Sequence, residues 1–275
     1  MPPLQYSRLT VPRRASDDSV LGLLLLHAPL GFETLGEDLI AFFREADIAR
    51  EAAARLSVAR IRHELTTDIP EGDALELYRA RSRPFSLGRR LWIEPGDPGD
   101  AAPPAGRLVL RVPASRAFGT GEHASTRLAL LALEDESLEE RSVLDVGTGS
   151  GILALAAAAL GAARVAACDI DADAVFVARE NLGRHCFGGR VALFAGGPSA
   201  CSGVFDLVVA NLLAAELLAE APRLLAGASA TGRVILSGIA WDREPEVLAC
   251  VGGEGWKVTA RRAEAEWICL CLTRG

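Results

Sequence analysis

The 275-residue chain is half apolar, poor in aromatic residues and carries a formal net charge of −7. This composition indicates a globular protein with one large and one small domain, and it excludes a disordered chain. The acidic balance argues against general nucleic-acid binding, which needs a basic surface, so we expect no direct nucleic-acid partner.

The cysteines and the N-terminal stretch bear on the cellular compartment. The six cysteines form no C-x-x-C pair, which favours free thiols in a reducing compartment and gives no reason to expect a metal site. The apolar run 20–26 is too short to span a membrane. Asp17 and Asp18 interrupt any signal-peptide pattern before that run. We therefore predict a cytoplasmic protein without membrane association.

The first 66 residues alternate strand-like and helical patterns. Strands are predicted over 4–11, 31–35, 39–43 and 58–65, and helices over 17–26 and 45–57. This βαββαβ order is typical of a ferredoxin-like α+β domain. No residue pattern in it suggests catalysis, so we predict a substrate-recognition domain over 1–66.

Residues 67–106 are predicted to connect that domain to a second one, over 107–275. The connection is expected to start in a polar linker over 66–72 and to continue as a short helix over 73–81. A strand over 90–93 and a surface loop rich in Pro and Gly over 95–106 follow. A strand over 107–112 opens the second domain.

A loop with two glycines and several hydroxyl side chains precedes a helix predicted to begin near Ala124. Its sequence from residue 117 is A-F-G-T-G-E-H-A-S-T-R-L. A helix N-terminus offers free backbone N–H groups to a ligand. Capped loops are common, so the pattern gains meaning only beside a second ligand-binding motif.

That second motif is the stretch from Ser142 to Gly151, which reads S-V-L-D-V-G-T-G-S-G. A short apolar strand, three glycines at alternate positions and an Ala- and Leu-rich helix over 152–160 predict a strand–turn–helix unit of a nucleotide-binding sheet. The third glycine of a dinucleotide fingerprint would fall on Ile152, which disfavours an NAD-dependent dehydrogenase. The pattern resembles motif I of S-adenosylmethionine-dependent methyltransferases. A tight turn without a ligand is the alternative.

Two polar residues are predicted at the ends of later strands. Asp169 ends a strand over 164–168, about 20 residues past the glycines, where a carboxylate can accept hydrogen bonds from ribose hydroxyls. Asp171 is better placed to cap the helix over 172–182. Asn211 follows a strand over 207–210 and offers both a donor and an acceptor, or else it caps the helix over 214–226.

The remaining elements complete the fold class. We predict a strand over 233–239, a helix over 244–251 and two closing strands over 256–261 and 267–272. Together these predict an α/β, Rossmann-like domain with a mostly parallel seven-stranded sheet, preceded by the small ferredoxin-like domain.

Five motifs together resemble the bacterial ribosomal protein L-eleven methyltransferases (PrmA type). They are Asp145-Val-Gly-Thr-Gly-Ser-Gly-Ile-Leu-Ala, Ala117-Phe-Gly-Thr-Gly-x-His-x-Ser-Thr, Cys168-Asp-Ile-Asp, Val209-Ala-Asn-Leu-Leu and Leu236-Ser-Gly-Ile. The resemblance covers nearly the whole chain. It implies the cofactor S-adenosyl-L-methionine, bound through Thr126, Gly147, Asp169 and Asn211. Gly149 and Phe118 are added for close backbone approach and for contact with the sulfonium.

The resemblance also implies the substrate, a protein of the large ribosomal subunit methylated at lysines and at its terminal amine. The chain departs from the family pattern at Ala74, Tyr78, Ser115 and Glu122, on the side that faces the substrate in the family. Another protein substrate, a small amine, or a non-catalytic cofactor-binding ribosome-associated factor are the alternatives. We expect a monomer.

Methyl transfer to lysine requires a neutral amine, whereas free lysine has a pKa of about 10.4. Desolvation and nearby acceptors must therefore favour the neutral form. Asn211 could contribute an acceptor. Glu122 and His123 are candidate proton acceptors whose alternative is a structural role, so no catalytic residue is assigned.

Overall fold

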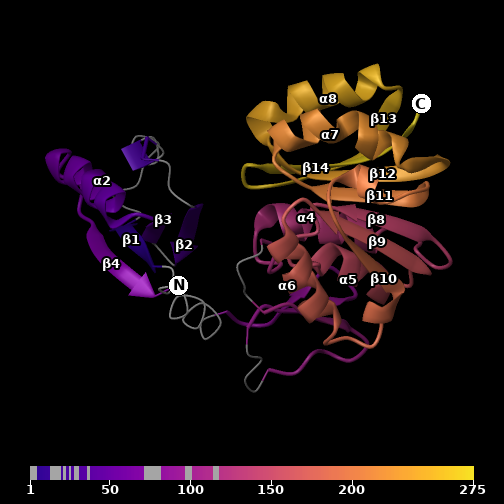
Figure 1. Ribbon diagram of the computed structural model, residues 1–275, viewed down its shortest axis with the longest axis horizontal. Coiled ribbons are helices and arrows are strands. Elements are labelled where there is room, and N and C mark those ends of the chain that lie inside the picture. The colour runs from indigo at the N-terminus through magenta and orange to yellow at the C-terminus, as the bar shows by residue number, and fades with distance from the viewer. Residues whose placement is uncertain are drawn as a thin grey trace. The chain divides into compact units, whose positions relative to one another are not determined.

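A computed structural model describes residues 5–12, 20, 23–24, 26–27, 31–35, 38–70, 82–96, 101–113 and 118–275. The chain divides into two compact units, residues 1–78 and 79–275 (Figure 1). The division falls inside the predicted connecting segment. The domain limits 1–66, 67–106 and 107–275 stay a prediction.

The first unit is a four-stranded antiparallel sheet with one described helix. Its elements are β1 (Gln5–Pro12), β2 (Gly31–Leu35), β3 (Asp38–Phe43), α2 (Ala46–Val58) and β4 (Glu64–Pro70). The strand order β2-β3-β1-β4 is that of the ferredoxin-like arrangement. Leu9, Phe43 and Leu56 lie in its buried core. Most of the predicted helix over 17–26 lies outside the described residues.

The predicted strand over 58–65 is confirmed only at residues 64 and 65, and the predicted linker over 66–72 is wrong where the structure describes it. Helix α2 runs through Val58, and Arg60 then adopts a positive φ of 58° that ends the helix. The last strand begins at Glu64 and pairs with β1, opposing Leu65 to Leu9 and Ile69 to Tyr6. Residues 58–63 alternate like a strand but do not form one. Residues 66–70 are rich in polar side chains, which is typical of a linker, but they form part of β4. Residues 71–81, including the predicted short helix, lie outside the described residues.

The second unit begins with a small three-stranded sheet of order β5-β6-β7. Its strands are β5 (Phe85–Leu87), β6 (Leu91–Glu94) and β7 (Leu108–Arg111). Strand β5 was not predicted, and β7 pairs with β6 rather than with the large sheet. Leu91, Ile93 and Leu110 join the core of the large domain, so the small sheet packs as part of this unit.

The large sheet has seven strands in the order β10-β9-β8-β11-β12-β14-β13. These are β8 (Ser142–Val146), β9 (Arg164–Asp169), β10 (Val191–Ala195), β11 (Phe205–Asn211), β12 (Ala228–Ala240), β13 (Trp256–Glu264) and β14 (Trp267–Arg274). The first five strands in that order run parallel, and β14 is antiparallel to both of its neighbours. The predicted fold class is confirmed, although β10 was not predicted.

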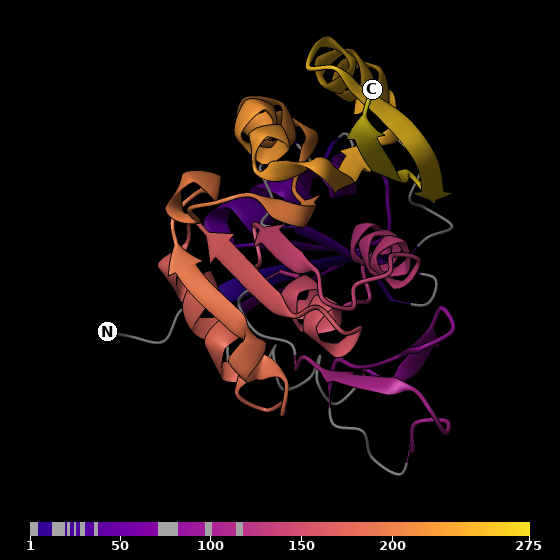
Figure 2. The ribbon, with the colours of Figure 1, turned by 90° about the vertical axis from the view of Figure 1, so that its right-hand side faces the viewer.

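Helices cover both faces of this sheet (Figures 1 and 2). They are α4 (Ala124–Glu134), α5 (Ile152–Ala159), α6 (Ala172–Leu182), α7 (Ala214–Ala226) and α8 (Glu244–Gly253). Val143 packs into the core under α4 and α5, whereas its neighbour Leu144 packs into the core under α7 and α8. Buried strands with both faces covered have continuous apolar sequences for this reason. None of the described helices has the length and apolar character to cross a membrane.

Candidate active site

The predicted glycine turn joins β8 to α5. Gly147 and Gly149 have positive φ angles of 70° and 53°, which side chains disfavour. A Cβ on Gly147 would lie 2.2 Å from a methyl of Leu212, and one on Gly149 would lie 2.6 Å from the carbonyl oxygen of Phe118. The backbone angle favours glycine at both positions, and at Gly149 the backbone oxygen of Phe118 also leaves no space for a side chain.

The buried side chain of Asp145 is hydrogen-bonded to the glycine turn and to the start of α5. Its Oδ2 accepts hydrogen bonds from the Thr148 hydroxyl (2.6 Å) and from the Ala154 N–H (3.1 Å). Complete burial raises the pKa of Asp145 to about 7. Its Oδ1 has no hydrogen-bond partner among the described residues. Sequence analysis assigned Asp145 no role, although an acid inside an apolar strand was a usable signal.

The loop before α4 lies against the glycine turn, the second ligand-binding motif. The Ser150 N–H donates to the Phe118 carbonyl at 2.9 Å, and the Ser150 hydroxyl donates to the Gly119 carbonyl at 2.5 Å. Asn181 of α6 donates to the Ser150 carbonyl at 2.9 Å. Ser150, which sequence analysis passed over, is thus the link between loop and turn. Residues 114–117, including Ser115, lie outside the described residues.

His123 caps the N-terminus of α4 and lies between two aromatic rings. Its Nδ1 contacts the Ser125 hydroxyl at 2.7 Å, and its ring centroid lies 5.2 Å from Phe118 and 4.9 Å from Trp267. Burial lowers the pKa of His123, opposed by the negative charge of Glu266. The result is a row of aromatic rings beside the glycine turn, ending at the largely exposed Phe118.

Glu122 is occupied by contacts within the second unit. Its carboxylate accepts hydrogen bonds from the hydroxyls of Ser82 and Thr120, both at 3.3 Å. Arg127 donates to its backbone carbonyl and also reaches Glu264 at 3.2 Å. These contacts brace the loop and support the structural alternative for Glu122.

Asp169 and Asn211 both lie at carboxyl ends of parallel strands. Asp169 accepts from the N–H groups of Gly149 (2.9 Å) and Asp171 (3.0 Å), and Asp171 caps α6 as predicted. Asn211 donates its amide N–H to the hydroxyl of the fully buried Thr126 at 3.2 Å. The Asn211 amide oxygen accepts no hydrogen bond from the described residues, so it is available to a ligand.

The structure brings the six predicted positions to one edge of the large sheet. Thr126 contacts Asn211, and Gly149 contacts both Asp169 and Phe118. Gly147 lies beside Leu212, the residue after Asn211. In open α/β sheets this edge, at the carboxyl ends of the strands, is where ligands bind.

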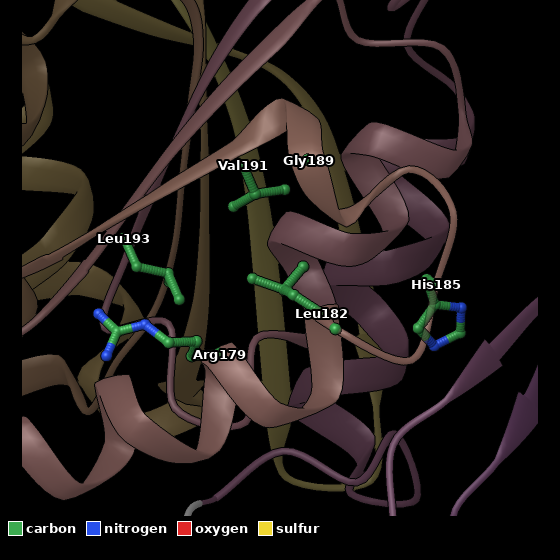
Figure 3. A pocket seen from close by; sticks show the side chains of 7 residues that line it. Arg179, Leu182, His185, Gly189, Val191 and Leu193 are labelled. Carbon is green, nitrogen blue, oxygen red and sulfur yellow. The ribbon is translucent and has the colours of Figure 1, made fainter.

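A pocket of about 450 Å³ lies elsewhere (Figure 3). Its lining comes from α6, from the loop after it and from the start of β10, and consists of Arg179, Leu182, Gly183, His185, Gly189, Val191 and Leu193. The amino end of β10 is opposite to the edge that carries Asp169. This pocket is therefore separate from the candidate active site.

Comparison with known proteins decides the family. The family model described as ribosomal protein L11 methyltransferase (PrmA) matches residues 31–275. The chain belongs to this family. It is an S-adenosylmethionine-dependent methyltransferase.

Individual relatives agree with this assignment. A ribosomal protein L11 methyltransferase of Geotalea uraniireducens is 40% identical over 221 residues, covering 76% of this chain and 70% of the relative. The ribosomal protein L11 methyltransferase of Geobacter sulfurreducens is 43% identical over 219 residues, covering 79% of this chain and 72% of the relative. The crystal structure of a ribosomal protein L11 methylase of Lactobacillus delbrueckii subsp. bulgaricus matches 70% of this chain and 99% of its own, with a TM-score of 0.64 and 34% identity.

The described residues fit S-adenosylmethionine. The partly exposed Asp169 carboxylate accepts one backbone N–H on each oxygen and keeps further lone pairs for ribose hydroxyls. Ile170, which follows Asp169, is 83% exposed and offers an apolar surface to a base. The free oxygen of Asn211 offers an acceptor on the other side of the turn.

Proposed function

We propose that this enzyme transfers methyl groups to lysine and N-terminal amines of a large-subunit ribosomal protein, ribosomal protein L11. The observation that carries the proposed substrate is the family membership, because the relatives are named as ribosomal protein L11 methyltransferases. A ribosomal protein substrate would place the reaction in the cytoplasm. The enzyme would act as a monomer, and the first domain would recognise the protein substrate.

Different site residues would bind different parts of the cofactor. Asp169 would hold the ribose and Ile170 would pack on the adenine, while Gly147 and Gly149 admit the rest of the cofactor to the backbone. Thr126 and Asn211, which are hydrogen-bonded to each other, would bind the end of the cofactor opposite the adenine. Phe118 would lie beside the sulfonium. Bound S-adenosylmethionine supplies an electrophilic methyl on a positively charged sulfur.

The remaining task of the protein is to present a neutral amine in line with that methyl. The aromatic row of Phe118, His123 and Trp267 would desolvate the amine and lower its pKa. The free oxygen of Asn211 would accept an N–H of the amine and fix its direction. Much of the rate would come from this positioning rather than from a dedicated base.

The first test is titration of the purified enzyme with S-adenosylmethionine by calorimetry, with Asp169→Ala beside the wild type. We expect the variant to lose about 1–3 kcal/mol of binding free energy, the usual cost of a lost hydrogen bond to a charged group. Asp173→Ala, which alters a neighbouring carboxylate outside the site, is the control and should bind normally. Equal affinity in Asp169→Ala would remove Asp169 from the cofactor site.

A further inference from the structure

Four of the most exposed apolar side chains in the second unit follow strands of the large sheet or lie in the loop beside them. Ile170 is 83% exposed, Trp241 66%, Leu213 59% and Phe118 58%. Ile170 and Phe118 have places in the proposed cofactor site. Leu213 and Trp241 have no such place, and a Trp this exposed is an unusual use of a large apolar side chain.

Backbone contacts place Trp241 next to the residue that pairs with Trp267, a member of the aromatic row. Ala240 of β12 is paired with Trp267 of β14, and the Trp241 N–H donates to the Glu266 carbonyl at 2.9 Å. Trp267 in turn contacts His123. Backbone contacts alone therefore set the position of Trp241 beside this row, and its side chain is free to serve another purpose.

Leu213 follows Asn211 by two residues, at the N-terminus of α7. Asn211 pairs with Ser237 across β11 and β12, so the chain leaves these neighbouring strands toward Leu213 and Trp241 at the same edge. Glu216 accepts a hydrogen bond from the Leu213 N–H at 3.1 Å, which fixes the backbone there. Two exposed apolar residues, each with its backbone N–H held by a hydrogen bond, thus follow two neighbouring strands, and β11 of these ends at the proposed amine acceptor Asn211.

Two unpaired acids accompany Trp241. Asp242 and Glu266 are exposed, and neither forms an ion pair with any residue that the structure describes. Other acids nearby are neutralised: Glu244 pairs with Arg261 at 2.6 Å and Glu246 with Arg243 at 2.8 Å. The charge left beside Trp241 is therefore negative and available to a basic partner.

We propose that Trp241, Leu213, Asp242 and Glu266 form a docking surface, the Trp241 surface, for the basic polypeptide segment that flanks the methylated amine. An aliphatic side chain of that segment would pack on Leu213, and a Lys or Arg would stack on Trp241 while Asp242 and Glu266 neutralise it. The inference rests on the proposed function, since it concerns how the protein substrate is held at the same site.

The test measures substrate binding apart from methyl transfer. Fluorescently labelled ribosomal protein L11 is titrated with enzyme in the absence of S-adenosylmethionine, and KM and kcat are then measured with it. Trp241→Ala should raise both Kd and KM for the protein about tenfold, as loss of an interface Trp does. The kcat and the affinity for S-adenosylmethionine should not change. Trp241→Phe should restore most of the binding.

Matched variants separate the surface from general effects. Phe176→Ala removes an aromatic side chain of α6 that is 57% exposed and lies outside the proposed surface, and it should leave Kd and KM unchanged. The double variant Asp242→Asn with Glu266→Gln should flatten the salt dependence of Kd. Equal Kd values for Trp241→Ala and Phe176→Ala, with an active wild type, would overturn the Trp241 surface alone. A wild type that binds S-adenosylmethionine but neither binds nor methylates the ribosomal protein would overturn the proposed function and the surface with it.

Discussion

At the scale of single residues, burial strongly disfavours the charged form of Asp145. Its carboxylate is fully buried, lacks a partner at Oδ1 and has a pKa raised from 3.8 to about 7. The folded protein therefore holds a proton there that the unfolded chain releases near pH 4. The unfolding free energy must fall as the pH rises from about 4 to about 7, and this contribution is constant above that.

Asp145→Asn should remove this pH dependence while keeping the turn. An amide oxygen in place of Oδ2 can still accept from Thr148 and Ala154, and the amide cannot ionise. We expect urea unfolding between pH 5 and 7 to show a less negative slope of stability against pH in the variant. Asp206→Asn is the control, because hydrogen bonds from Ser142 lower the pKa of Asp206, so its titration lies below this range. An unchanged slope in Asp145→Asn would mean that Asp145 is ionised throughout.

At the scale of elements, the glycine turn and the loop on it behave as one unit. Gly149→Ala would place a Cβ 2.6 Å from the backbone oxygen of Phe118, and no flexible side chain can yield there. The loop must move away, and Ser150 then loses its hydrogen bonds to it. We expect S-adenosylmethionine affinity to fall more than about tenfold and stability to fall by about 1–3 kcal/mol.

The control for this substitution is Gly252→Ala in α8, where a Cβ would meet nothing within 4 Å. Its stability should be equal or slightly higher, because Ala has the better helix propensity. Calorimetry and thermal unfolding on the three proteins compare both quantities. Normal cofactor binding by Gly149→Ala would show that the loop and the turn move independently.

The elements also show what the sequence could and could not predict. The turn at Gly147 and Gly149 and the polar ends at Asp169 and Asn211 were predictable, because local chemistry dictates them. Strand β10 and the start of β4 were not, because strand pairing with distant neighbours decides them. The role of Asp145 and the exposure of Trp241 depend on what packs around each residue, which spacing along the chain does not reveal.

At the scale of the whole molecule, each unit has its own buried core. Leu9, Phe43 and Leu56 belong to the core of the first unit, and the described residues of the second unit form two cores of their own. All six predicted cofactor-binding residues lie in residues 79–275. Cofactor binding should therefore need only the second unit, whereas recognition of a large substrate should need both.

A truncated chain of residues 79–275 tests this division of labour. It should fold cooperatively and bind S-adenosylmethionine within about twofold of the full chain, since it retains the complete glycine turn and both of its cores. Its KM for ribosomal protein L11 should rise about a hundredfold, because a second set of contacts no longer adds to the first. The full chain measured in parallel is the reference, and thermal unfolding confirms that the fragment is folded. A folded fragment that methylates the ribosomal protein with an unchanged KM would mean that the first domain does not recognise the substrate, and that the Trp241 surface and the aromatic row suffice to hold it.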